Sequence, residues 1–324
     1  MDALPVVDAG LCMLDRLAAA RCSACVDACP TRALSAGPGG SLELAATDCT
    51  GCAGCAAACP AGAISVAGSA PLPRAQADRA GRVSLVCPER GGGICLQALG
   101  LESLARLWRD GVRHIVLAVG DCAACANGAT LRFDVLLAAF NALLADRGMP
   151  ILSAAPATGE RRPSRLDAAE RPDARRRAFL GPLFASSEAL PALHEVQKAG
   201  AGRPGRRFAC APAIDPGTCS GCGACVNLCP TAAMTLINTG RHDAAYEIRP
   251  EACTGCRLCA DVCDEGAVTL RFLAPAAPPV ALRPYRCAGC GVPGHSPRAD
   301  GPERGFCPVC RKAAHYRKLH VIQA

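Results

Sequence analysis

The chain has 324 residues, and 25 of them are cysteines. So many cysteines in a chain this long indicate metal binding rather than a small secreted disulfide framework. Seven Phe, three Tyr and one Trp cannot build one large core, so we expect two to three small domains organised by Ala, Val, Leu and metal. The net charge of +7 comes largely from arginines within 161–207 and after residue 283, and a solvated surface is its simplest interpretation.

The first residues lack the basic and apolar regions of a signal peptide, and no apolar run is long enough to span a bilayer. Thiolates that hold metal clusters are sensitive to oxygen, which favours a reducing compartment. We therefore expect a cytoplasmic protein with no membrane span.

Residues 1–72 carry two runs of closely spaced cysteines. The second run has gaps of two, two and three residues and is followed by a proline: Cys49, Cys52, Cys55 and Cys59. The first run keeps the last three positions of this pattern: Cys22, Cys25 and Cys29. Ala19 stands where its first cysteine is expected, and Cys12 lies seven residues further upstream. An enlarged loop over 13–21 would bring Cys12 in as the missing ligand; the alternative is a three-ligand [3Fe–4S] or labile site with Cys12 free.

Residues 73–155 begin with a Pro- and Ala-rich linker and then alternate apolar strands with amphipathic helices. Strands are expected to begin near Arg82, His114 and Pro150, and helices to lie within 91–111 and 129–148. Strand–helix–strand–helix–strand predicts a small parallel sheet with right-handed crossovers. Ligands of such sheets bind beyond the carboxyl ends of the strands.

Four cysteines are expected at that edge of the sheet if its first two strands are neighbours: Cys87, Cys95, Cys122 and Cys125. Three interpretations of these cysteines compete. They hold a metal or iron–sulfur cluster, or the CxxC pair is a redox dithiol, or they are inert thiols near a phosphate-like ligand on the Gly91–Gly93 turn. The arrangement resembles the iron–sulfur delta subunits of hydrogenase and heterodisulfide reductase complexes. That resemblance implies a [2Fe–2S] cluster.

Residues 156–208 are rich in Arg, Pro and Ala and have no core pattern, which indicates a tether. One or two short amphipathic helices are expected near its end, broken by Pro182 and Pro191. An alternative is a docking segment at 171–186 for a partner subunit, with an apolar face of Phe179, Leu183 and Phe184. Cys210 is interpreted as a buried strand cysteine and not as a ligand.

Residues 209–275 carry the same spacing twice in full: Cys219, Cys222, Cys225 and Cys229, then Cys253, Cys256, Cys259 and Cys263. Both this region and 1–72 resemble bacterial dicluster ferredoxins, in which three cysteines of one run and the fourth of the other hold each [4Fe–4S] cube. The resemblance implies a one-turn helix after each fourth cysteine, a short strand after it, and electron transfer. The implied sets are Cys12, Cys22, Cys25 and Cys59; Cys49, Cys52, Cys55 and Cys29; Cys219, Cys222, Cys225 and Cys263; Cys253, Cys256, Cys259 and Cys229.

Residues 276–324 begin with a Pro-rich stretch and end in two CxxC pairs, which are Cys287, Cys290, Cys307 and Cys310. Four thiolates at this spacing suit a closed tetrahedral Zn²⁺ site. The tail resembles a zinc ribbon and, in its CxxCG and CPxC pieces, a rubredoxin, which would hold iron instead.

The expected fold is a multidomain α+β chain: two ferredoxin-like 2[4Fe–4S] modules flank a small α/β parallel-sheet domain, and a zinc ribbon follows. No nucleophile, acid/base pair or substrate pocket stands out in the sequence, so a non-catalytic electron-transfer subunit is favoured over an enzyme. The polyferredoxin-like layout resembles accessory proteins of formate dehydrogenases and hydrogenases, which implies a redox protein or oxidoreductase complex as partner. The alternative is an assembly or maturation factor for such a metalloenzyme; with few aromatic residues for base stacking, no nucleic-acid partner is expected.

Overall fold

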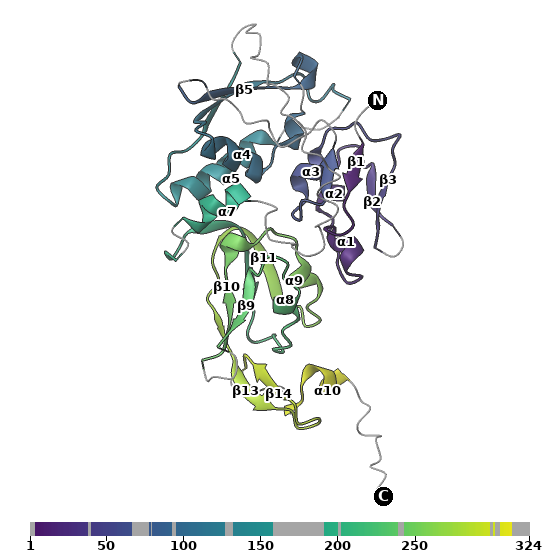
Figure 1. Cartoon of the computed structure of the whole chain (residues 1–324), viewed down its shortest axis with the longest axis vertical. Helices are drawn as coiled ribbons and strands as arrows, with labels where there is room; N and C mark the ends of the chain where they lie inside the picture. The colour runs from purple at the N-terminus through teal and green to yellow at the C-terminus, as the bar shows by residue number, and fades with distance from the viewer. Residues whose placement is uncertain are drawn as a thin grey trace, which may run out of the picture.

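The computed structural model describes residues 4–37, 40–66, 78, 80–92, 95–126, 132–157, 191–199, 202–238, 243–298, 301 and 305–312. Figure 1 shows a mixed α+β chain in which the middle domain and the N-terminal module lie side by side. The C-terminal module lies below them, and the four-cysteine tail lies beyond it. The proposed docking segment, with Phe179, Leu183 and Phe184, falls outside the described residues.

The N-terminal module consists of two antiparallel strand pairs and three short helices. The outer pair joins the two ends of the module, β1 (Pro5–Val7) with β4 (Ile64–Val66). The inner pair is a hairpin, β2 (Leu34–Ala36) with β3 (Leu42–Leu44). The helices are α1 (Met13–Arg16), α2 (Ala24–Asp27) and α3 (Gly54–Ala58).

The C-terminal module repeats this plan with longer strands. Its outer pair is β8 (Arg207–Ile214) with β11 (Val268–Pro275). Its inner pair is β9 (Met234–Ile237) with β10 (Ala245–Ile248), extended by β12 (Val280–Ala281). Its helices are α8 (Ala224–Asn227), the 3₁₀ turn η3 (Pro250–Ala252) and α9 (Leu258–Asp261). The repeat predicted from the cysteine runs is therefore a repeat of strand pairing as well.

The expected one-turn helix after each fourth cysteine was wrong. The four helices α2, α3, α8 and α9 each contain the third cysteine of their run and end before the fourth. Three of the fourth cysteines precede a proline, namely Cys29, Cys59 and Cys229. A residue before proline is biased away from the α region, which favours ending the helix before the fourth cysteine.

The middle domain is the predicted parallel sheet, with strand order β5-β6-β7. The strands are β5 (Arg82–Val86), β6 (His114–Ala118) and β7 (Ser153–Pro156). Two 3₁₀ turns follow β5, η1 (Pro88–Arg90) and η2 (Leu96–Ala98), and the helices are α4 (Leu101–Arg109) and α5 (Phe133–Ala145). The helix expected within 91–111 is thus split, because Leu99 and Gly100 are extended.

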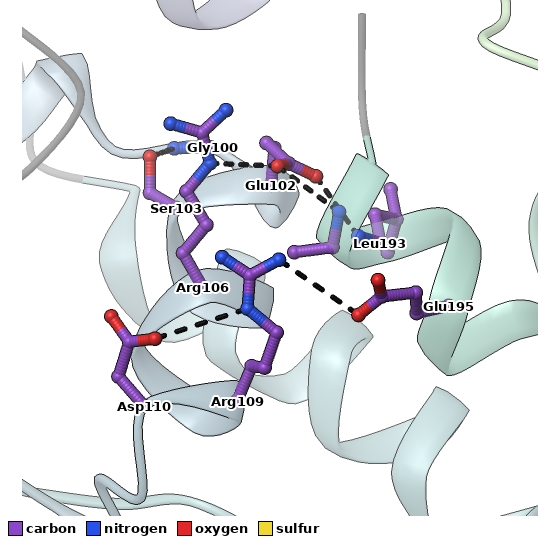
Figure 2. Close-up of polar contacts among 9 residues, drawn as sticks. Gly100, Glu102, Ser103, Arg106, Arg109, Asp110, Leu193 and Glu195 are labelled. Carbon is purple, nitrogen blue, oxygen red and sulfur yellow. Dashed lines mark hydrogen bonds and ion pairs between the residues drawn. The ribbon is translucent and has the colours of Figure 1, made fainter. Parts of the chain in front are cut away.

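One helix of the expected tether, α7 (Pro191–Lys198), packs against α4 in the core of the middle domain. Its first turn is held by Glu102 of α4, as Figure 2 shows. The carboxylate accepts hydrogen bonds from the backbone N–H of Ala192 at 3.2 Å and of Leu193 at 2.9 Å, and from Nε of Arg106 at 2.7 Å. These amides have no intrahelical partner, so Glu102 acts as a remote N-terminal cap.

The middle domain is joined to the C-terminal module at the start of β8. Asp146, which follows α5, accepts a bidentate pair from the Arg207 guanidinium at 2.7 and 2.8 Å, and also the Arg207 N–H at 2.9 Å. The buried Arg147 donates to the backbone oxygens of Leu143, Gln197 and Arg207. Together these bonds tie α5, α7 and β8 into one unit.

The tail packs directly on the C-terminal module. It consists of the hairpin β13 (Arg283–Arg286) and β14 (Pro293–Ser296) and the helix α10 (Pro308–Lys312). Arg311 and Lys312 of α10 form ion pairs with Glu265 and Asp264, respectively. Of the helices that the structure describes, none is both long and apolar enough to cross a bilayer.

Candidate metal centres

The structure gathers the predicted ligands of the N-terminal module into two groups. Cys12, Cys22, Cys25 and Cys59 line one small cavity, and Cys29, Cys49, Cys52 and Cys55 line another. Cys12 reaches its group from the first position before α1, which the residues 13–21 make possible. Each group therefore contains three cysteines of one run and the fourth of the other, as the resemblance implies.

In the C-terminal module the cysteines of the same two crossed sets interact electrostatically. Burial and then the negative charges of Cys219, Cys222 and Cys263 raise the pKa of Cys225 to about 12. Burial and then the charges of Cys256 and Cys229 raise the pKa of Cys253 to about 12. Thiolates crowded into an apolar site repel one another, and positively charged iron would offset that repulsion. The donor set thus fits cubane clusters.

Backbone amides around the fourth cysteines were not foreseen from the sequence. The N–H groups of Ala33, Ala63 and Ala267 each donate to the sulfur of the cysteine four positions earlier, at 3.2–3.3 Å. The hydroxyls of Thr31 and Thr231 also lie 3.7 and 3.8 Å from the sulfurs of Cys29 and Cys229. Hydrogen bonds to ligand sulfur tune cluster potentials, so these groups are tuning candidates. The repeated Cys-Pro-Thr could have indicated the hydroxyls.

The four cysteines of the middle domain converge at the carboxyl edge of the sheet. Cys87 follows β5, Cys122 and Cys125 follow β6, and these two strands are adjacent. The Gly120 N–H after β6 donates to the sulfur of Cys87 at 3.1 Å. Burial, and then the charges of Cys52, Cys125 and Cys122, raise the pKa of Cys95. The fold thus places Cys87, Cys122 and Cys125 at the same edge of the sheet, with Cys95 close enough to interact electrostatically with Cys122 and Cys125.

The glycine turn before Cys95 has a packing explanation. A Cβ on Gly92 would lie 1.7 Å from the carbonyl oxygen of Val86, so only glycine fits there. The Gly92 N–H also donates to the carbonyl oxygen of Cys87 at 3.0 Å. Gly92 therefore packs against the end of β5, and Gly93 lies outside the described residues.

The tail cysteines form a tighter group than any other in the described residues. The sulfurs of Cys287, Cys290, Cys307 and Cys310 all lie within 4.8 Å of one another. Zinc–sulfur bonds of about 2.3 Å in a tetrahedron place sulfurs about 3.8 Å apart, so one metal ion suits this group. Hydrogen bonds from the backbone, led by the Cys307 N–H at 3.2 Å, lower the pKa of Cys287 to about 6. A lowered pKa favours the thiolate form of Cys287, which is the form that binds a metal cation.

A cavity of about 590 Å³ lies where both modules meet the middle domain. Three predicted ligands of different clusters line it, namely Cys29, Cys59 and Cys253. Cys210 of β8 lines it too, is buried, and packs against the loop between Cys253 and Cys256. A Cβ on Gly255 in that loop would lie 2.6 Å from the Cys210 sulfur. Cys210 is therefore a strand cysteine beside a cluster loop, outside all four predicted ligand sets.

Comparison with known families covers both modules. Residues 20–63 and residues 212–270 each match a family described as a 4Fe-4S dicluster domain. The chain therefore contains two dicluster iron–sulfur domains, which imply about four [4Fe–4S] clusters and electron transfer. Neither match extends into the middle domain or the tail. A comparison with curated proteins gave no match.

Proposed function

We propose that the chain relays single electrons through four [4Fe–4S] clusters as a subunit or accessory of a larger oxidoreductase of formate dehydrogenase or hydrogenase type. The observation that carries the proposal is the presence of two dicluster domains in one chain. The N-terminal one gathers its thiols into two crossed groups of four, and the thiols of the C-terminal one interact in the same crossed pattern. When bound, the clusters supply one-electron exchange, and the chain fixes their separation, burial and hydrogen bonds.

The middle domain extends this proposal. We infer that Cys87, Cys95, Cys122 and Cys125 hold a [2Fe–2S] cluster, as in the delta subunits that this domain resembles. Support comes from the position of η2, which begins after Cys95 and packs against α3 of the N-terminal module. Cys95 also interacts electrostatically with Cys52, a predicted ligand of one cube of the N-terminal module. A cluster there would extend the relay into the middle domain.

The first test is the content of iron, acid-labile sulfide and zinc per chain after anaerobic purification. The relay predicts about sixteen iron atoms in four cubes, about two more if the middle site is filled, and about one zinc. About eight iron atoms would mean that one module is empty, and a maturation factor for a metalloenzyme would then be the better proposal. Purification with a large oxidoreductase, and restored turnover when this protein is added back, would support the relay.

A further inference from the structure

The residues between Cys12 and Cys22 are an insertion into the cysteine pattern. The other three runs place two residues between their first and second cysteines, whereas here residues 13–21 intervene. The family match begins only at residue 20, after most of the insertion. Its sequence, MLDRLAAAR, is more apolar than a solvent-exposed loop requires.

The insertion is covered by the C-terminal module. Met13 and Ala20 are 5% and 8% exposed and form a small core with Leu258 of α9, which is 7% exposed. The N–H of Arg21 donates to the Asp261 carboxylate, also on α9, at 2.8 Å. Figure 1 shows α1 on the side of its module that faces α9. An apolar core and a polar bond thus join segments about 240 residues apart.

Two predicted ligands lie inside this contact. Cys22 of the N-terminal module and Cys256 of the C-terminal module both pack against the core of Met13, Ala20 and Leu258. They belong to different clusters, so the contact brings one cluster site of each module together. The two groups within each module already share ligand runs, so the relay needs a link between the modules. Cys22 and Cys256 pack on one apolar core, whereas Cys29, Cys59 and Cys253 line a cavity of about 590 Å³.

We propose that residues 13–21 are a docking element that seats the N-terminal module on α9, and that electrons cross between the modules where Cys22 and Cys256 pack on the same core. The proposal rests on the relay function. It also gives the insertion a role that closing the Cys12 loop does not explain, since Met13 and Ala20 share a core with Leu258 of the other module. Asp261 and Ala20 are then positioning residues for electron transfer.

The test uses two variants of the full chain and one matched control. Asp261→Ala removes the acceptor of the Arg21 N–H, and Ala20→Glu inserts a carboxylate beside Asp261 in the packed core. Asp264→Ala removes a carboxylate three residues further along that faces Lys312 of the tail instead. The measurements are hydrogen exchange of residues 13–21, iron content, and the EPR spectrum of the fully reduced protein.

Both variants should keep the wild-type iron content and lose amide protection over 13–21. Their EPR signals should also lose part of the broadening that comes from spin–spin coupling between clusters of the two modules. The control Asp264→Ala should keep the wild-type iron content, amide protection and EPR broadening. Unchanged protection and broadening in both variants would overturn the docking element, and lost protection with unchanged broadening would overturn the electron crossing. If the wild-type cubes are filled but the reduced protein passes no electron to an added acceptor protein, the relay function itself is wrong. If the wild-type protein does transfer electrons and both variants behave like the wild type, only the docking inference is wrong.

Discussion

Cys12 precedes α1 and lines the same small cavity as three other predicted ligands. If it is a ligand, Cys12→Ala should cost the chain up to about four iron atoms, or about one if a [3Fe–4S] cluster survives. Cys210→Ala is the matched control, because Cys210 is a buried cysteine outside the four ligand sets. Iron and sulfide analysis of both proteins, with EPR to detect [3Fe–4S], decides the matter. An unchanged iron content in the Cys12 variant would mean that Cys12 is a free thiol and not a ligand.

At the scale of residues, the cysteine groups were accessible from the sequence because their spacing is local. Three thiols separated by two residues each lie on one short segment of the chain, whatever surrounds it. The hydrogen-bond donors to those sulfurs were harder to predict from the sequence. The N–H groups of Ala33, Ala63 and Ala267 reach sulfur only through the backbone path after the fourth cysteine, and no side chain marks them.

Among the elements, α7 depends on a carboxylate 90 residues away. Glu102→Ala should destabilise the chain by about 1–2 kcal/mol, since two first-turn amides of α7 lose their acceptor. Glu102→Gln should cost less, because its amide oxygen still accepts a bond. Glu195→Ala is the control, since Glu195 meets Arg109 only at 3.8 Å on the surface. Anaerobic thermal unfolding and hydrogen exchange of 191–198 provide the measurement; equal losses for Glu102 and Glu195 would contradict the cap.

The joint between α5 and β8 has a defined pH dependence. Hydrogen bonding by the Arg207 side chain lowers the pKa of Asp146 from 3.8 to about 2. A depressed carboxyl pKa stabilises the folded state above the unfolded pKa, and this contribution is lost as pH falls from about 4 to 2. Arg207 is 39% exposed, so we expect about 1 kcal/mol after solvent screening.

Asp146→Asn should therefore lower the free energy of unfolding equally at pH 7 and at pH 5. Both pH values lie above the range of about 4 to 2 in which Asp146 becomes protonated. The comparison uses anaerobic unfolding of wild type and variant at the two pH values. A destabilisation that shrinks markedly between pH 7 and pH 5 would show that another group, with a higher pKa, is responsible.

Periodicity predicted the elements of the middle domain and their parallel order, because alternating strands and helices allow few topologies. It missed the break before α4, where Gly100 is extended and starts the helix. It also placed α7 in the tether. The pairing of Glu102 with the first turn of α7 is a tertiary contact, and composition alone gave no sign of it.

For the whole molecule, the sequence indicated how many modules to expect but not how they meet. The N-terminal module contacts the C-terminal one through Ala20 and Leu258, which no local pattern connects. The tail was expected as a separate ribbon, yet a Cβ on Gly221 in a cluster loop would lie 2.0 Å from the carbonyl oxygen of His295 in β14. Such close packing makes the tail part of the module beside it.

The tail therefore offers a last prediction at this scale. Cys290→Ser replaces an exposed cysteine of the four-cysteine group and should remove about one metal ion per chain. If that ion is zinc, the visible absorption and the iron content should stay at the wild-type level. Structural zinc supplies folding free energy, so β13, β14 and α10 should lose amide protection together.

Cys210→Ser serves as the control, since it changes a cysteine outside the tail and should leave zinc and tail protection unchanged. Loss of one iron atom and of visible absorption in Cys290→Ser would identify a rubredoxin-type centre instead. Phe306, the residue before Cys307, lines the same small cavity as Cys219, so this part of the tail lies beside that cluster site. The relay would then continue into the tail, and its partner would be sought there rather than at the middle domain.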